Sequence, residues 1–355
     1  MSPRPRILSV IGARPEIMQA APVSAALADL ADEILVHTGQ HYDVAMSEAH
    51  ILATRLPQPR HNLGVGSRPR EEQLALGQER MAGVIDIEQP DVVVVRGDTN
   101  ATLSGARAAV AAGIPLVHVE AGLRSYRDDM PEEHNRIETD RLADLLLAPT
   151  PGARANLLNE GMSGRIEVTG DPLCDTLERS RADIVPAEGE YLLATVHRNY
   201  NTDAPERLQA VLDCLARSPW RVTFPVHPRT RAALKSWKLA VPGNVDLVDP
   251  VPYTRMLELE RGAQAIATDS GGVQREAYLW GVPCITLREE TEWVDTVAAG
   301  WNVLVGVDPD AFAAAVEPRA GGMPSRPNIF GDGRAAHRIA QLVVELASGE
   351  LEAAA

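Results

Sequence analysis

The chain of 355 residues is 45% hydrophobic and 23% charged, an ordinary composition for a soluble protein, and its length predicts two domains rather than one. A formal net charge of −15 argues against nucleic acid or an anionic membrane as the main partner. The three cysteines (Cys174, Cys214 and Cys284) are too widely spaced for a disulfide framework or a zinc site, and no apolar run approaches the roughly 18 residues of a membrane-spanning helix, so we expect a cytoplasmic protein.

The first half of the chain alternates apolar runs with alanine-rich segments. Buried strands are predicted at residues 6–11, 34–38, 91–95, 114–119, 144–148 and 166–170. The run from Val92 to Val95 is continuously β-branched, which indicates burial on both faces, as in a parallel sheet. Helices are predicted after the first strand, to about Leu30, and after the third strand, to Ala112. Strands that alternate with helices in this way predict a parallel α/β sheet.

The second half repeats this pattern after a polar stretch at residues 178–189, which we expect to be a hinge. Strands are predicted at residues 190–195, 221–226, 245–248, 265–268 and 284–287, and a last helix at about 335–347. The expected fold class is therefore α/β, with two doubly wound, Rossmann-like domains at residues 1–172 and 173–334 that face a central cleft. Ligands of such domains bind at the carboxyl ends of the strands.

The sequence Asp-Ser-Gly-Gly-Val-Gln-Arg-Glu (269–276) lies where a predicted strand passes into a helix. Glycine lets the backbone approach a ligand closely, and a helix start offers unpaired N–H groups and the positive end of the helix dipole. Ser270, Gly271 and Gly272 are therefore predicted to bind an anion, most naturally phosphate, and Glu276 could accept hydrogen bonds from ribose hydroxyls. The alternative is a tight turn with a serine cap, because short glycine motifs often match by chance.

Polar side chains follow predicted strands in both halves of the chain, and eight of them would converge on one cleft. They are Arg14, Gln40, His41, Asp98, Glu120, His197, His227 and Ser270. Each has a purely structural alternative: Asp98 could cap a helix, Glu120 could close a strand, and His227 could belong to a turn. Glu132, in Pro-Glu-Glu (131–133), could simply offset the dipole of a helix.

Carboxylates in a cleft with a phosphate site favour chemistry on a sugar linked to a nucleoside diphosphate. When the diphosphate leaves C1, the C2 proton becomes acidic, and inversion at C2 needs acid and base groups on both faces of the ring. Asp98, Glu120 and Glu132 could supply these groups, while Arg14, Arg198 and the Ser-Gly-Gly turn could stabilise the departing diphosphate. We expect no cofactor, because the reaction needs neither a nicotinamide nor a metal, and no metal site, because metal-ligand spacing is lacking.

Eight short motifs resemble, in this order, those of the non-hydrolysing UDP-N-acetylglucosamine 2-epimerases, and the resemblance extends from Gly-Ala-Arg-Pro-Glu (12–16) to Gly-Asp-Gly (331–333). They are Thr-Gly-Gln-His (38–41), Gly-Asp-Thr (97–99), His-Val-Glu-Ala-Gly-Leu-Arg (118–124), Pro-Glu-Glu-His-Asn-Arg (131–136), His-Arg (197–198), Pro-Val-His (225–227), Asp-Ser-Gly-Gly-Val-Gln-Arg-Glu (269–276) and Arg-Glu-Glu-Thr-Glu (288–292). The resemblance implies a glycosyltransferase-B-like (GT-B-like) fold, a homodimer, and a last helix at about 335–350 that returns to the first domain. It also implies interconversion of UDP-GlcNAc and UDP-ManNAc through anti elimination to 2-acetamidoglucal and UDP.

The resemblance also implies roles for individual residues. Catalytic roles are implied for Asp98, Glu120, Glu132 and His197. The residues implied to bind the UDP-sugar are Arg14, Arg136, Arg198, His227, Ser270, Gly271, Gly272 and Glu276. In bacterial relatives a second UDP-GlcNAc activates the enzyme from beside the active site, and Gln40, His41 and Arg68 are candidates for that region.

Three positions depart from the family pattern. Gln19 stands where the first loop usually leads to a lysine, Tyr200 replaces an acid after His-Arg, and Trp293 replaces an arginine. These departures leave open an altered substrate, such as a diacetamido or uronic acid UDP-sugar.

Three rival functions share parts of the same pattern. A GT-B glycosyltransferase would use a UDP-sugar but would not need carboxylates on both faces of C2. A hydrolysing epimerase would release UDP together with a free sugar, and a non-catalytic sensor would bind without turnover. Because all four implied catalytic residues are present, epimerisation is the favoured hypothesis.

Overall fold

The computed structural model describes residues 4–39, 51–52, 54–317 and 322–351. The chain forms two compact units. The first comprises the chain up to Arg179 and from Asn328 onward, and the second comprises Ser180–Pro327. The chain therefore crosses between the units twice, once after Arg179, within the polar stretch predicted as a hinge, and once after Pro327.

The first unit is built on a parallel sheet of seven strands among the described residues, in the order β3-β2-β1-β4-β5-β6-β7. The strands are β1 (Arg6–Ile11), β2 (Asp32–His37), β3 (His61–Asn62), β4 (Val92–Arg96), β5 (Leu116–Val119), β6 (Leu145–Ala148) and β7 (Arg165–Val168). The chain winds outward from β1 to β3 and then returns to the other side of β1, so the strand order reverses between β1 and β4. In doubly wound folds, the carboxyl ends of strands at such a reversal form the ligand site.

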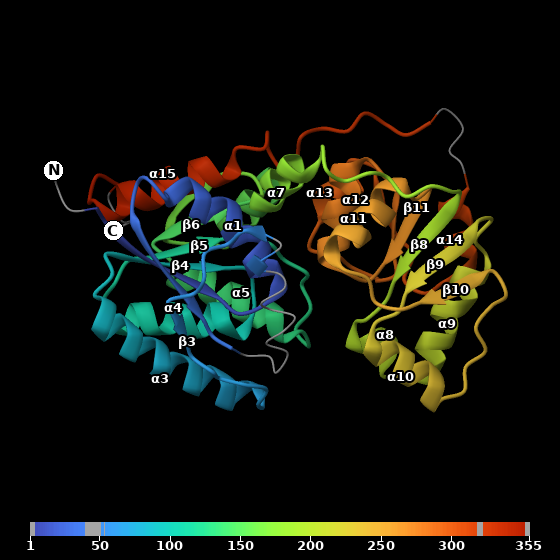
Figure 1. Ribbon diagram of the computed structural model, residues 1–355, viewed down its shortest axis with the longest axis horizontal. Helices are drawn as coiled ribbons and strands as arrows, with labels where there is room; N and C mark the ends of the chain where they lie inside the picture. The colour runs from blue at the N-terminus through green and yellow to red at the C-terminus, as the bar shows by residue number, and fades with distance from the viewer. Residues whose placement is uncertain (1–3, 40–50, 53, 318–321, 352–355) are drawn as a thin grey trace. The chain divides into compact units, whose positions relative to one another are not determined.

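Helices cover both faces of this sheet (Figure 1). They are α1 (Arg14–Leu27), α3 (Arg70–Glu88), α4 (Asn100–Ala111), α5 (Pro131–Leu142), α6 (Pro151–Asn159), α7 (Pro172–Ser180) and α15 (Ala335–Ala347). Helix α15 comes from the end of the chain, yet its apolar residues share one buried cluster with β1, β4 and α1. The C-terminal helix therefore completes the core of the first unit.

The second unit is built on a second parallel sheet, whose described strands follow the order β10-β9-β8-β11-β12-β13. These strands are β8 (Tyr191–Thr195), β9 (Arg221–Pro225), β10 (Val245–Val248), β11 (Ala265–Thr268), β12 (Cys284–Thr286) and β13 (Asn302–Leu304). Its helices are α8 (Asn199–Thr202), α9 (Pro205–Ala216), α10 (Pro228–Ser236), α11 (Tyr253–Gly262), α12 (Gly271–Trp280), α13 (Val294–Ala298) and α14 (Pro309–Val316). The strand order reverses between β8 and β11, which places the ends of these two strands at the ligand position of this sheet.

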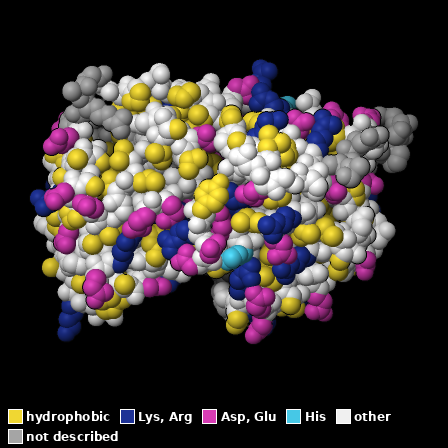
Figure 2. Space-filling model, turned by 180° about the vertical axis from the view of Figure 1, so that it is seen from behind, with side chains coloured by type: hydrophobic (Ala, Val, Ile, Leu, Met, Phe, Trp, Pro, Cys, Tyr) yellow, Lys and Arg dark blue, Asp and Glu magenta, His cyan; other side chains and the backbone are white. Residues whose placement is uncertain are grey.

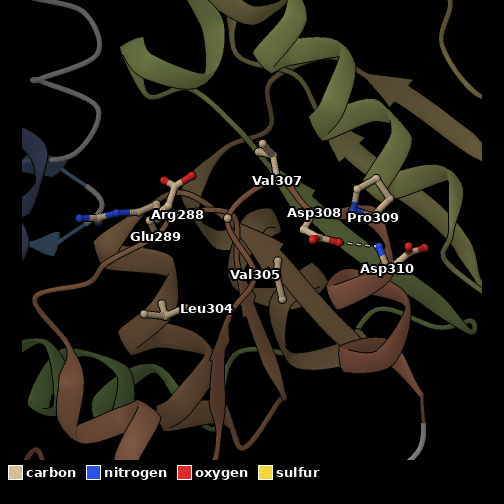
Figure 3. A pocket seen from close by; sticks show the side chains of 9 residues that line it. Arg288, Glu289, Leu304, Val305, Val307, Asp308, Pro309 and Asp310 are labelled. Carbon is tan, nitrogen blue, oxygen red and sulfur yellow. Dashed lines mark hydrogen bonds between the residues drawn. The ribbon is translucent and has the colours of Figure 1, made fainter.

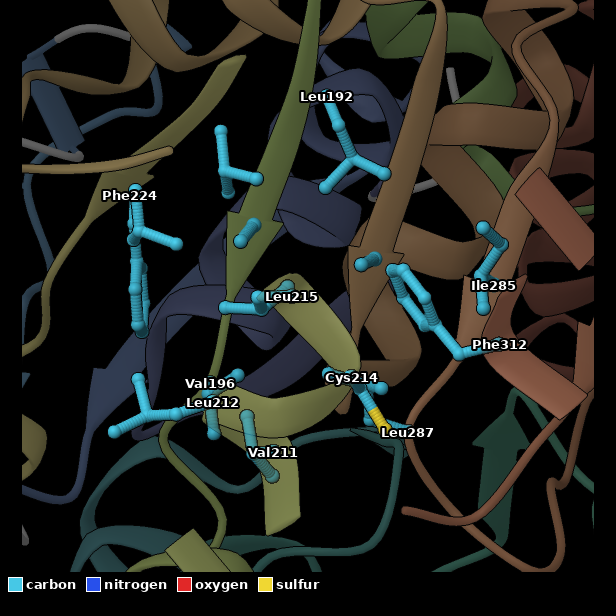
Figure 4. Close-up of a cluster of buried hydrophobic side chains, with 14 of the residues drawn as sticks. Leu192, Val196, Val211, Leu212, Cys214, Leu215, Phe224, Ile285, Leu287 and Phe312 are labelled. Carbon is cyan, nitrogen blue, oxygen red and sulfur yellow. The ribbon is translucent and has the colours of Figure 1, made fainter. Parts of the chain in front are cut away.

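The core of the second unit lies under α9. Leu208, Leu212 and Leu215 from this helix pack with Phe224 of β9 and Phe312 of α14 in a cluster of fully buried side chains (Figure 4). Aromatic side chains are scarce in this chain, at 4% of residues, so aliphatic side chains supply most of the apolar burial.

The predicted α/β fold with parallel sheets is confirmed, and every strand predicted from the sequence is present. The predicted strand at residues 114–119 begins only at Leu116, because Ile114 bonds back to Ala109 and Pro115 has no N–H to donate. Two edge strands, β3 and β13, are not predicted from the sequence. Within the described residues, no helix combines the length and the apolar character that crossing a membrane would require.

Candidate active site

Glu16, in the first turn of α1, ties together the loops that follow β1 and β4. Its Oε2 accepts hydrogen bonds from the backbone N–H groups of Gly12 (2.5 Å) and Ala13 (2.7 Å). Its Oε1 accepts from the hydroxyls of Thr99 (2.5 Å) and Thr102 (3.0 Å). Burial raises the pKa of Glu16, and these hydrogen bonds offset that effect only in part. Glu16 is absent from the predicted site, because in the sequence it resembles any acid at a helix start.

Asp98 follows β4, but it does not cap the next helix. The cap of α4 is Thr99, whose side chain accepts hydrogen bonds from the first turn. The carboxylate of Asp98 instead accepts a hydrogen bond from Arg136, and the side chain of Asn135 donates to the Asp98 carbonyl (2.9 Å). Arg136 is buried and also binds Glu133 (2.6 Å). Helix α5 thus holds Asp98 in place while leaving it partly exposed.

Two adjacent acids at the start of α5 have different environments. Glu133 is buried and accepts hydrogen bonds from the Ser125 N–H (3.0 Å), the Ser125 hydroxyl (2.9 Å) and the Tyr126 N–H (2.8 Å). It therefore stabilises the turn at Tyr126, whose φ is 56°. Glu132 is partly exposed. Of the two, only Glu132 reaches solvent, and its catalytic role stays a prediction.

Glu120 follows β5 in a strained backbone conformation. Its φ is 71°, in the left-handed region that residues with a side chain rarely adopt. Its carboxylate accepts a hydrogen bond from Nε2 of Gln19, which lies in the second turn of α1. Such strain persists only when the surroundings impose it, and it concentrates at functional sites. Gln19, one of the three departures from the family pattern, is therefore a direct neighbour of a predicted catalytic acid.

A buried polar network supports the loops that carry Asp98 and Glu120. His118 donates from Nε2 to the carbonyl of Gly97 (2.8 Å), while its Nδ1 lies 2.6 Å from Asp140. Asp140 also accepts from the Gly122 N–H (3.2 Å) and forms an ion pair with Arg124 (2.7 Å). His118, Gly122 and Arg124 belong to the motif at residues 118–124, but the sequence does not predict what each of them does. Their roles depend on partners that are distant in the sequence.

Two of the basic residues predicted in the first unit lie at its surface, in contrast to the buried Arg136. Arg14 and Arg68 are exposed, and Arg68 donates from Nε to the carbonyl of Val65 (2.9 Å). Gln40 and His41, the other candidates for an activating site, lie outside the described residues. Figure 2 shows acidic and basic side chains interspersed over one face of the molecule.

In the second unit, the predicted anion turn joins β11 to α12. Ser270 is the N-cap: its Oγ accepts from the Val273 N–H at 3.5 Å. A Cβ on Gly271 would lie 2.4 Å from Oε1 of Glu292, whereas a Cβ on Gly272 would have nothing closer than 3.8 Å. A side chain at position 271 would therefore have to displace the carboxylate of Glu292. Gly272 has no such constraint, and it leaves the helix start open to a ligand.

His197 and His227 follow β8 and β9, and their ring centroids are 5.8 Å apart. His227 caps α10, because its Nδ1 accepts a hydrogen bond from the N–H of Arg229 (3.2 Å). Desolvation and then the charge of Arg229 lower the pKa of His227. His227 therefore has a structural role at the start of α10. Its ring nevertheless lies beside that of His197, at the same edge of the sheet.

Glu276 lies in the second turn of α12, facing Tyr253 at the start of α11. Its carboxylate is buried and accepts a hydrogen bond from the Tyr253 hydroxyl (2.7 Å). A carboxylate can accept hydrogen bonds from a diol such as ribose, and this role of Glu276 stays a prediction. Tyr253 is a neighbour that sequence reasoning missed.

The motif at residues 288–292 packs against the anion turn. The buried guanidinium of Arg288 forms an ion pair with Glu292 (2.9 Å), the acid that occupies the space beside Gly271. Trp293 is also buried, and the guanidinium of Arg275 stacks on its ring at 4.3 Å. Burial raises the pKa of Tyr200, and the charge of Arg288 is the largest influence that opposes this rise. Tyr200 and Trp293, two of the three departures from the family pattern, therefore pack around the anion turn.

A surface hollow of about 740 Å³ lies at the carboxyl ends of β12 and β13. Its lining includes the acids Glu289, Asp308 and Asp310, and the side chain of Arg288 extends away from Asp308 and Asp310 (Figure 3). Acidic walls disfavour a diphosphate, so the start of α12 remains the better anion site. Among the residues that the structure describes, no cluster of three or more His, Cys, Asp or Glu side chains could hold a metal ion.

Comparison with known proteins gives consistent results. Residues 26–344 match the family described as UDP-N-acetylglucosamine 2-epimerase. A UDP-N-acetylglucosamine 2-epimerase homolog of Methanococcus maripaludis is 39% identical, with 96% of this chain and 100% of the relative covered. The UDP-2,3-diacetamido-2,3-dideoxy-D-glucuronate 2-epimerase of Pseudomonas aeruginosa is 38% identical, again over 96% of this chain and all of the relative.

A solved structure agrees with the sequence comparisons. The crystal structure of Methanocaldococcus jannaschii UDP-GlcNAc 2-epimerase in complex with UDP-GlcNAc and UDP aligns with a TM-score of 0.84 at 38% identity. The alignment covers 96% of this chain and 99% of that one.

Proposed function

This chain belongs to the UDP-N-acetylglucosamine 2-epimerase family, and we propose that it interconverts UDP-GlcNAc and UDP-ManNAc by anti elimination of UDP and re-addition to 2-acetamidoglucal. The observation that carries the proposal is the pair of carboxylates after β4 and β5. Asp98 and Glu120 are each held by a different partner, Arg136 and Gln19. The two acids are therefore held independently of each other, one by a cation and one by a neutral amide, and a reaction that inverts C2 needs two such groups acting on opposite faces of the ring.

In the proposed reaction, each unit contributes one part of the chemistry. The start of α12, with Ser270 and Gly272, offers N–H donors to the diphosphate, and Glu276 accepts from the ribose. The acids Asp98, Glu120 and Glu132 remove the C2 proton and return one from the other face. The C1–O electron pair leaves with UDP and returns from it, so the reaction needs no external oxidant or cofactor.

Two UDP-sugars are candidate substrates within the family. The Pseudomonas aeruginosa relative is an epimerase of a diacetamido uronic acid, and its identity to this chain is within one percentage point of that of the Methanococcus maripaludis relative. Gln19 is a reason to test both sugars. It places a neutral amide against Glu120, where the family pattern usually has a lysine. We therefore keep UDP-diacetamido-glucuronate as the second candidate substrate.

The quaternary state and cellular location are also proposals. The family resemblance supports a cytoplasmic homodimer whose ligand is a UDP-sugar. Size-exclusion chromatography with light scattering would measure the mass of the assembly, for which twice 38.3 kDa is expected. The mass of a single chain would contradict the dimer.

The test is proton exchange at C2. The purified protein is incubated with UDP-GlcNAc in D₂O without any added cofactor, and the reaction is followed by NMR. Deuterium at C2 together with UDP-ManNAc is the expected result, and neither a glycosyltransferase nor a sensor would produce it. Free UDP rising in step with a released sugar would identify a hydrolysing epimerase instead. Exchange only with UDP-diacetamido-glucuronate would reassign the substrate.

A further inference from the structure

Asp269 joins the ends of β8 and β11, the two strands at which the order of the second sheet reverses. The residue is fully buried. Its carboxylate accepts hydrogen bonds from the N–H groups of His197 (3.1 Å to each oxygen) and Arg198 (2.9 Å) and from Nδ2 of Asn201 (3.1 Å). One side chain therefore fixes the loop that carries His197 and Arg198 to the strand that leads into the anion turn.

The same carboxylate contacts the imidazole ring of His197. Its Oδ1 lies 3.4 Å from Nδ1, and the His197 side chain is 40% exposed while that of Asp269 is 0% exposed. A ligand can therefore reach the ring but not the carboxylate. The contact through Nδ1 directs the opposite nitrogen, Nε2, away from Asp269. A carboxylate in this position favours the charged form of an imidazole and fixes its orientation.

We propose that Asp269 is a positioning residue that orients the His197 ring and favours its protonated form, so that Nε2–H can donate to the departing diphosphate. The inference rests on the proposed epimerase reaction. As the C1–O bond breaks, its electron pair goes to the diphosphate oxygen and the C2 proton goes to a carboxylate. The His197 hydrogen bond stabilises the new negative charge without net proton transfer, and re-addition reverses each step.

The negative charge of Asp269 lies in direct contact with the His197 ring. Charged or titratable groups of the second unit in these surroundings include His227 beside the His197 ring, and Arg198, Tyr200, Arg229, Arg288 and Glu290, which act together with Asp269 on Tyr200 or His227. Three of these are cations, which oppose a positive imidazole, and Asp269 is the acid in direct contact with the ring. Removing its charge should therefore make His197 lose its proton at lower pH.

The first arm of the test uses the wild-type protein and needs no turnover. Two-bond ¹⁵N NMR of histidine-labelled protein reports which ring nitrogen carries the proton, and the His197→Gln variant assigns the signal. The expected result is a neutral His197 ring protonated at Nδ1, where the hydrogen faces Asp269. A neutral ring protonated at Nε2 would overturn the proposal, even if every variant failed to fold.

The second arm compares Asp269→Asn with Asp213→Asn, an exposed carboxylate of α9 in the same unit. Asn retains an oxygen that can accept from the backbone but has no charge. In Asp269→Asn, the His197 titration and the alkaline limb of the kcat profile should move about one pH unit lower. kcat should fall roughly 10- to 100-fold with a smaller change in KM. Asp213→Asn should match the wild type.

The two failures can be told apart. If wild-type protein does not exchange the C2 proton of either UDP-sugar, the proposed function fails, and the ring tautomer still tests the Asp269 contact. If exchange proceeds but Asp269→Asn keeps the wild-type titration and pH profile, only the role of Asp269 is wrong.

Discussion

Glu120 offers a test of whether backbone strain is stored at the candidate site. Its φ of 71° is in a region that favours glycine, so relieving it should stabilise the fold. We compare Glu120→Ala with Glu120→Gly, because both variants lose the carboxylate and its hydrogen bond from Gln19. We expect the glycine variant to be more stable by about 1 kcal/mol, the reverse of the usual order of alanine and glycine. Urea unfolding measures the difference, and an alanine variant at least as stable as the glycine variant would show that the site is unstrained.

A substitution at Asp98 tests whether its carboxylate transfers a proton in the proposed reaction. The Asp98→Asn variant keeps the shape of the side chain but cannot act as an acid or a base. Arg136 retains its second partner, Glu133. We expect turnover to fall by roughly 10²- to 10⁴-fold while UDP binding, measured by calorimetry, stays within about twofold. Asp129→Asn, which removes an exposed acid paired with Arg127, is the matched control and should retain activity. Near wild-type rates in Asp98→Asn would exclude a catalytic role for Asp98.

The residues that the sequence alone could predict are those that follow strands. Asp98, Glu120 and His197 are found because parallel strands end at one edge of a sheet, and the apolar runs that mark those strands are clear. Glu16 and Asp269 were missed as site residues. Both are buried carboxylates whose partners come from other elements, and nothing in the local sequence distinguishes such an acid from one that faces solvent.

At the scale of elements, the two glycines at the start of α12 make opposite predictions. Gly271→Ala would push a Cβ to 2.4 Å from Glu292, so we expect a loss of about 1–3 kcal/mol in the free energy of unfolding. Gly272→Ala has room, and alanine is the better helix former, so its stability should equal or exceed that of the wild type. If the diphosphate binds here, Gly272→Ala should still weaken UDP binding, because the new methyl group would block the approach to the backbone. Calorimetry that shows unchanged UDP affinity in Gly272→Ala would move the anion site elsewhere.

Glu16 joins α1 to α4 and should give the protein a specific pH dependence. Because burial raises its folded pKa above the unfolded value, the folded state binds a proton more tightly than the unfolded state does. Its contribution to stability is therefore fully present below about pH 4.5 and is lost as the pH rises through the folded pKa. In Glu16→Gln this loss cannot occur, so the stability of the variant relative to wild type should improve between pH 4.5 and pH 7.5. Urea unfolding at both values gives the comparison, and a difference that does not change with pH would contradict it.

The elements that the sequence did not predict are short edge strands. β3 has two residues and β13 has three, and each is a strand only because a neighbouring strand supplies hydrogen bonds: β2 pairs with β3, and β12 pairs with β13. Local sequence contains little of this information. Buried central strands such as β4, by contrast, need continuous apolar residues on both faces, and that pattern is visible from the sequence alone.

At the scale of the whole molecule, both crossings between the two units are attached to one end of α12. Just after the first crossing, Arg181 donates to the Leu279 carbonyl (3.4 Å), and its guanidinium lies over the Trp280 ring (5.4 Å). Just before the second, Arg326 donates to the same Leu279 carbonyl (2.6 Å), and the Tyr278 hydroxyl donates to Pro327 (2.6 Å). The helix that begins at the anion turn therefore ends at the two points where the chain leaves and re-enters the first unit.

A substitution at Arg326 tests whether this side chain holds the second crossing against α12. It donates to the Leu279 carbonyl at the C-terminus of α12, and its guanidinium lies over the rings of Tyr278 (5.9 Å) and Trp301 (5.8 Å). Arg326→Ala removes these contacts and should release the second crossing from α12, at a loss of about 1–2 kcal/mol. Limited digestion with thermolysin, mapped by mass spectrometry, should then cut near residues 322–330 several times faster than in wild type. Arg217→Ala, which removes an exposed arginine paired with Asp310, should leave the cleavage unchanged. Equal cleavage rates in the Arg326 and Arg217 variants would show that the crossing is held by other contacts.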